Sequence, residues 1–246
     1  MNAVARTTFF TRARRDDEPS KTRGESATIA LGFRVKSGFA IAVALRGPAS
    51  APQAVARRIV ELSDPDASET RQPYHDGFYR EQNDTGEIAR RVAIVKRCAR
   101  KSVAGLLDDL WKEHEALSRA TIARLKGSRT SRQARLRAGL VVGSVIDPEQ
   151  IGNLHIRAHA SEGRLFRTVL EDALRSNGIE CDVMIEKQLA AKAAEGLGRR
   201  DGDIKRVIAA LGKTLGGPWR SDEKAAATAA WLMIQLGAPR RTPRHR

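Results

Sequence analysis

Residues 153–178 read NLHIRAHASEGRLFRTVLEDALRSNG, and this stretch decides how the chain on either side of it is interpreted. Its second half carries apolar residues at helical spacing, which predicts an amphipathic helix: Leu165, Phe166, Val169, Leu170, Ala173 and Leu174. Asn177-Gly178 is a helix-stop signal. Apolar runs at 138–146 and 179–185 predict a strand on each side. We therefore expect this helix to pack on a sheet.

The first turns of the same helix carry a polar cluster. His155, His159 and Glu162 are spaced so that all three lie on one helix face. Two imidazoles and a carboxylate form a metal-ligating set, which makes these residues the candidate catalytic residues, although the HExxH pattern is absent. Two alternatives remain open. The cluster is a buried structural network where the helix meets the sheet, or it is a phosphate site built from the helix N-terminus, Arg157 and a protonated histidine.

The rest of the chain completes an α/β pattern. Residues 28–35, 39–46 and 54–62 read as three strands of an antiparallel meander, with a tight turn at 36–38. Helices are predicted at 85–117, 186–195, 204–215 and 222–236. The loop at 63–83 holds both tyrosines, a histidine and a phenylalanine. It is expected to lie pinned over the sheet edge by its rings, with a binding surface as the alternative.

Composition sets the domain boundaries and the compartment. Residues 1–26 and the basic tail at 237–246 are predicted to be disordered, and 27–236 to form a single domain. Two cysteines, Cys98 and Cys181, are too few for a disulfide framework and suit a reducing cytoplasm. The sequence has no run of about 18 apolar residues, so no membrane span is expected.

The charge balance favours a polyanionic partner. The formal net charge is +15 at pH 7, which predicts contact with nucleic acid. The densest basic run, 119–137, contains no acidic residue. Its arginines and hydroxyl side chains suit phosphate contacts, and the candidate nucleic-acid-binding residues are Arg124, Lys126, Arg129, Arg132, Arg135 and Arg137. The alternative is a solvated basic connection between two elements.

The order of the predicted elements, three strands, helix, strand, helix, strand and helices, resembles the ribonuclease H-like superfamily. The resemblance covers 27–236 and implies a three-layer fold, in which a mixed five-stranded sheet has helices on both faces. It also implies divalent metal ions held by carboxylates. Asp147 and Glu149 after the fourth strand and Asp222 in the last helix are the residues that match this set. The first strand, IALGFRV at 29–35, carries no acid, and Arg34 stands in it.

Two functions follow from these observations. The first is a nucleic-acid-associated protein with a ribonuclease H-like core, a divergent or inactive phosphodiesterase with a divalent metal as its expected cofactor. The alternative is a non-catalytic binding or scaffold module for a protein or a small phosphorylated ligand near His155 and Glu162.

Overall fold

The computed structural model describes residues 29–77, 80–113 and 136–237. The strands are β1 (Ile29–Val35), β2 (Phe39–Arg46), β3 (Gln53–Glu61), β4 (Arg137–Val142) and β5 (Glu180–Ile185). The longer helices are α1 (Thr85–Glu113), α3 (Leu154–Ser176), α4 (Leu189–Leu197), α5 (Asp201–Leu215) and α6 (Ser221–Gly237). Short 3-10 helices are η1 (Ser68–Arg71), η2 (Pro148–Gln150) and η3 (Glu186–Gln188). The segments predicted to be disordered lie outside the described residues, except Gly237, which ends α6.

The strands form one mixed five-stranded sheet in the order β3-β2-β1-β4-β5. β1, β2 and β3 pair antiparallel, whereas β4 pairs parallel with both β1 and β5. This is the meander plus two parallel strands that the sequence predicts, so the predicted α/β fold with a mixed five-stranded sheet is confirmed. The carboxyl ends of β1, β4 and β5 therefore meet at one edge of the sheet.

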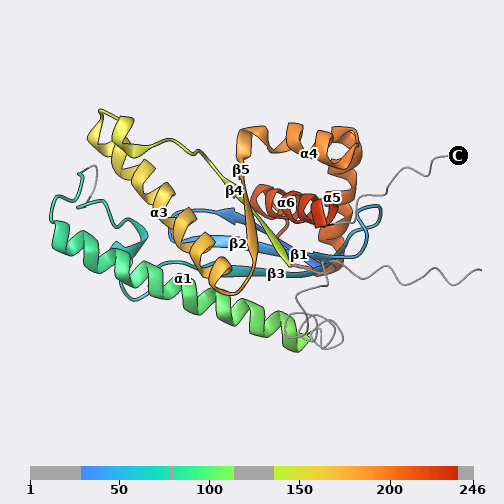
Figure 1. The fold of residues 1–246 in the computed structure, drawn as a ribbon, viewed down its shortest axis with the longest axis horizontal. Coiled ribbons are helices and arrows are strands. Elements are labelled where there is room, and N and C mark those ends of the chain that lie inside the picture. The colour runs from blue at the N-terminus through green and yellow to red at the C-terminus, as the bar shows by residue number, and fades with distance from the viewer. Residues whose placement is uncertain (1–28, 78–79, 114–135, 238–246) are drawn as a thin grey trace, which may run out of the picture.

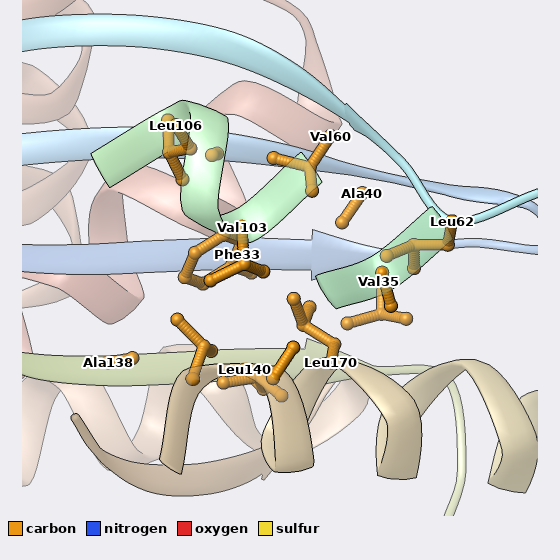
Figure 2. Close-up of a cluster of buried hydrophobic side chains, with 14 of the residues drawn as sticks. Phe33, Val35, Ala40, Val60, Leu62, Val103, Leu106, Ala138, Leu140 and Leu170 are labelled. Atoms are coloured by element: carbon orange, nitrogen blue, oxygen red, sulfur yellow. The ribbon is translucent and has the colours of Figure 1, made fainter. Parts of the chain in front are cut away.

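Helices cover both faces of the sheet, which gives three layers (Figure 1). α1 and α3 pack on one face, against side chains such as Phe33 and Leu140. Figure 2 shows this core, in which Val103 of α1 and Leu170 of α3 lie with Phe33 of β1 and Leu140 of β4. α6 packs on the opposite face, where α4 contacts α6, and α5 contacts both α6 and β3. No helix among the described residues is long and apolar enough to cross a membrane.

The contact between β1 and α6 depends on a glycine. A Cβ atom added at Gly32 would lie 1.8 Å from the carbonyl oxygen of Ala226 in α6. The alanines of α6 that face the sheet are fully buried, among them Ala226 and Ala230. Small side chains on both elements thus let the helix backbone approach the sheet closely. Gly32 has a packing role here.

β4 is shorter than predicted, because it ends at Val142 rather than at residue 146. Its neighbours stop there too: β1 pairs with β4 only as far as Val141, and β5 only as far as Val142. Val145 and Ile146 are 48% and 58% exposed. The apolar run continues past the last residue that has a strand partner, and apolar character alone does not show where pairing ends.

Candidate functional site

The N-terminal part of α3 presents the predicted cluster on one face. Asn153 caps the helix, and its side chain accepts a hydrogen bond from the backbone N–H of Ile156. The ring nitrogens Nε2 of His155 and His159 lie 3.2 Å apart. Glu162, one turn further along, is completely buried, while the side chain of His159 is 48% exposed. The structure therefore brings together all three candidate catalytic residues.

A third histidine, His75, joins this cluster from the loop between β3 and α1. Its Nε2 lies 3.3 Å from Nδ1 of His155, and its Nδ1 lies 2.7 Å from Oε1 of Glu162. His75 is 5% exposed. One ring nitrogen from each of the three histidines lies within 4.8 Å of the others. Among the described residues, these three histidines form the group whose ligand atoms lie close enough together to hold a metal ion.

The loop that carries His75 is fixed to both helices of this face. Its backbone forms an isolated bridge from His75 to Glu81. The backbone carbonyl of His75 accepts a hydrogen bond of 2.8 Å from Arg91 of α1. Glu81 accepts two hydrogen bonds of 3.1 Å from Arg157 of α3. These contacts hold the imidazole of His75 over α3, so polar contacts to α1 and α3 fix this loop.

Sequence reasoning missed His75 because no local pattern connects it to the helix. His75 and His155 are 80 positions apart, so no helical or strand period relates them. The usable signal was that a loop rich in aromatic residues held a histidine. The Arg157–Glu81 pair also weakens the phosphate-site alternative, because Nε and Nη2 of that guanidinium already donate to a carboxylate.

Burial controls the protonation of the inner part of the cluster. Desolvation raises the pKa of Glu162 to about 7, with the nearby His159 acting in the opposite direction. Desolvation also lowers the pKa of His75. Both shifts favour the uncharged forms of these two side chains, whose Nδ1 and Oε1 atoms lie 2.7 Å apart. A neutral imidazole is the form that binds metal ions.

The histidine nitrogens are close enough to share one metal ion. Two nitrogens bound at about 2.0–2.1 Å to one tetrahedral Zn²⁺ lie about 3.3 Å apart. His155 has one such neighbour at each ring nitrogen: Nδ1 lies 3.3 Å from His75, and Nε2 lies 3.2 Å from His159. A single ion would use only one of these nitrogens, and one nitrogen from each of the three rings lies within 4.8 Å of the others. Glu162 lies behind two of these rings. Its Oε1 is 2.7 Å from Nδ1 of His75, and its Oε2 is 3.4 Å from Nδ1 of His159. That buried Oε2 has no hydrogen-bond partner. Carboxylates commonly orient metal-binding histidines in this way.

The remaining predicted site residues lie elsewhere. Asp147 caps η2 and pairs with Arg164 at 3.3 Å. Glu149 is exposed, and Asp222 pairs with Lys36 at 3.1 Å. None of these three carboxylates belongs to a described group with metal-ligand spacing. Arg137 pairs with Asp182 of β5 at 2.9 Å. The other predicted nucleic-acid-binding residues lie outside the described residues: Arg124, Lys126, Arg129, Arg132 and Arg135.

Comparisons with known proteins give weak structural similarity and no sequence relative. No protein-family model and no curated protein matches the chain. The structure of Thermus thermophilus RuvC is similar with a TM-score of 0.43 and 7% sequence identity, over 85% of this chain and 95% of RuvC. The structure of T. thermophilus RuvC in complex with Holliday junction substrate gives 0.42 and 8%, over 85% and 94%. A sequence identity of 7–8% matches no residue of this chain to a functional residue of RuvC.

Proposed function

We propose that this protein binds a divalent transition metal, Zn²⁺ in the first place, through His75, His155 and His159, and that the bound metal makes it a divergent phosphodiesterase acting on nucleic acid. The observation that supports this most is the set of three imidazoles, with a buried carboxylate behind two of them. Imidazole nitrogens suit Zn²⁺ far better than Mg²⁺, which prefers oxygen ligands. The metal would therefore lie at the start of α3 rather than at the edge of the sheet.

The protein side chains have separate tasks in this proposal. His75 is buried and fixes the inner side of the site, whereas His159 is about half exposed and borders the solvent. Glu162 orients the ring of His75 through the contact of 2.7 Å to its Nδ1, and it faces Nδ1 of His159 at 3.4 Å. Three protein ligands leave one position of a tetrahedral ion open on the side of His159, as in catalytic zinc sites. A bound zinc ion would supply there a water molecule that loses its proton near neutral pH.

The substrate class is supported by a cationic surface on α1. Lys96, Arg97, Arg100 and Lys101 are exposed on α1, the helix that packs beside α3. Among the residues that the structure describes, no carboxylate forms an ion pair with any of these four side chains. Unpaired cations along a helix are suited to neutralising the phosphates of a nucleic-acid strand.

The test is a zinc titration of the full-length protein by calorimetry after treatment with a chelator. The wild type should bind one Zn²⁺ per chain, and H75A, H155A and H159A should each weaken binding at least about 100-fold. H245A, which alters a histidine that is not among the three proposed ligands, is the matched control and should bind as the wild type does. Equal zinc binding by the wild type and H75A would refute the metal site.

A cleavage assay then separates the two functions. Labelled single- and double-stranded DNA and RNA are incubated with the zinc-loaded protein, and the products are separated by size. Cleavage that disappears in H159A but persists in H245A supports the phosphodiesterase. Zinc binding without cleavage of any of these substrates would contradict the catalytic part of the proposal and favour the non-catalytic binding module.

A further inference from the structure

A second cluster of charged side chains lies at the edge of the sheet where the parallel strands end. Arg34 is the next-to-last residue of β1, and Glu186 follows the last residue of β5. Asp222 stands in the first turn of α6. In the ribonuclease H-like fold this edge is where carboxylates are expected to hold divalent metal ions. Here the central strand β1 carries Arg34 instead, and this residue is only 6% exposed.

The contacts of Arg34 extend across the whole edge. Its Nη2 donates to Oε2 of Glu186 at 2.5 Å, and its Nη1 donates to the backbone carbonyl of Val35 at 2.9 Å. Nη1 also reaches the carbonyl of Val141 in the neighbouring β4 at 3.4 Å. Its Nε lies 3.7 Å from Oδ1 of Asp222 and makes no hydrogen bond. One side chain thus contacts β1, β4, η3 and α6.

The charges at this edge balance without a metal ion. Lys36 lies 3.1 Å from the same Oδ1 of Asp222, so two cationic side chains face two carboxylates. A divalent cation placed between Glu186 and Asp222 would lie beside the buried positive charge of Arg34, and like charges repel. The residues at this edge therefore do not fit the metal ions that the fold implies.

We infer that the guanidinium of Arg34 occupies the place of the divalent metal at this sheet edge, so that the edge is a permanently closed ion-pair cluster and binds no divalent cation. Glu186 and Asp222 are the carboxylates that neutralise this built-in cation. Removing the guanidinium while keeping both carboxylates should open a site for a hard divalent cation. This inference rests on residues other than the three histidines and stands independently of the proposed function.

The experiment is a titration of R34S with Mg²⁺ and Ca²⁺, followed by calorimetry and by the shift in melting temperature. These oxygen-preferring cations are chosen because a three-histidine site binds them poorly, so they report on the sheet edge. R34S should bind one cation at least about tenfold more tightly than the wild type and be stabilised by it. The gain should disappear in R34S/E186Q/D222N, which has the same cavity but no carboxylates.

Two results would overturn the inference. One is a folded R34S protein, verified by circular dichroism, that gains no affinity for either cation. The other is Mg²⁺ or Ca²⁺ binding by the wild type that is lost in E186Q/D222N, since the closed cluster should bind neither. This second measurement uses the wild-type protein, and it decides the matter if R34S does not fold. Recovery of the fold of R34S by an excess of Mg²⁺ would support the inference.

Discussion

Glu162 connects the stability of the metal-free protein to the chemistry of its candidate site. Its side chain is completely buried, and one of its carboxylate oxygens has no hydrogen-bond partner. A buried carboxyl group without full compensation is costly in its charged form, which is why its pKa rises to about 7. Natural sequences keep such groups mostly where a function needs them.

The pH dependence of stability should reveal this carboxyl group. The pKa of Glu162 is higher in the folded protein than in the unfolded chain, so the folded state binds more protons between about pH 4.5 and 7. Its contribution to the free energy of unfolding is therefore largest below that window and falls as the pH rises through it, by up to about 3 kcal/mol. Urea denaturation of the chelator-treated wild type and of E162Q at several pH values measures this.

The comparison with E162Q isolates the effect, because glutamine stays uncharged throughout the range. Relative to E162Q, the wild type should lose stability between the two ends of the window. The neighbouring His75 changes in the opposite direction, since its lowered pKa costs stability as the pH falls, and it is present in both proteins. A difference between wild type and E162Q that stays constant with pH would contradict the assigned pKa.

At the residue scale, the sequence predicted the half of the site that one helix carries. His155, His159 and Glu162 have a period of 3.6 residues, so their common face could be derived from spacing alone. His75 could not be found in that way, because its position depends on how a loop folds back over α3. The loop is held by contacts such as Arg91 to the carbonyl of His75, and side-chain contacts of this kind have no sequence period.

At the level of elements, the close packing of α6 on β1 is the most demanding contact of the fold. Replacing Gly32 by alanine would place a methyl group against the backbone of α6, with 1.8 Å between Cβ and the carbonyl oxygen of Ala226. Backbone atoms cannot move aside as a flexible side chain can, so either the helix or the strand must shift. The three layers tolerate such shifts poorly because interiors are densely packed.

We expect G32A to lower the free energy of unfolding by about 3 kcal/mol or more. G105A is the matched control: Gly105 is exposed in the middle of α1, and an added Cβ there meets nothing within 4 Å. Alanine is the better helix former, so G105A should raise stability by about 0.5–1 kcal/mol. Urea denaturation compares the three proteins, and a G32A protein as stable as the wild type would show that the layers separate more easily than the contact distance implies.

Strand and helix positions were largely predictable, whereas their ends were less so. β2 begins and ends where the sequence predicts, because Gly38 and the break after Arg46 bound a clear apolar run. The predicted end of β4 was wrong by four residues, because the observed end depends on where β1 and β5 stop pairing. Pairing partners lie far away in the sequence, and their lengths cannot be derived from the strand itself.

Over the whole molecule, the excess of positive charge matters through where it remains unpaired. Many cations of the described residues are neutralised locally, such as Lys205 and Arg206 of α5, which lie 2.6 Å from Asp201 and Asp203 respectively. The four exposed cations in the middle of α1 have no such partner among the described side chains. Net charge gives the strength of attraction to a polyanion, and unpaired charge gives its place.

Nucleic-acid binding should therefore depend on α1 more than on α5. R97A/R100A should weaken binding to DNA or RNA and lower the slope of log affinity against log salt concentration by about 2, one unit for each phosphate that the variant no longer neutralises. K205A/R206A removes the same number of charges from paired positions and should leave the slope nearly unchanged. Fluorescence anisotropy at several salt concentrations gives both slopes. Equal reductions in the two variants would show that only total charge matters.

The close approach of α6 to β1 has a consequence for how the chain folds during synthesis. The β1–β2 hairpin is near the start of the sequence, while the helix that covers its second face is the last of the described elements. Sequence-distant contacts of this kind slow folding. Until the ribosome has released the final helix, one face of the hairpin, with Ala30, Val43 and Leu45, stays open to water. A nascent chain of this protein should therefore depend on chaperone binding for longer than one whose early strands are covered by the next helix made.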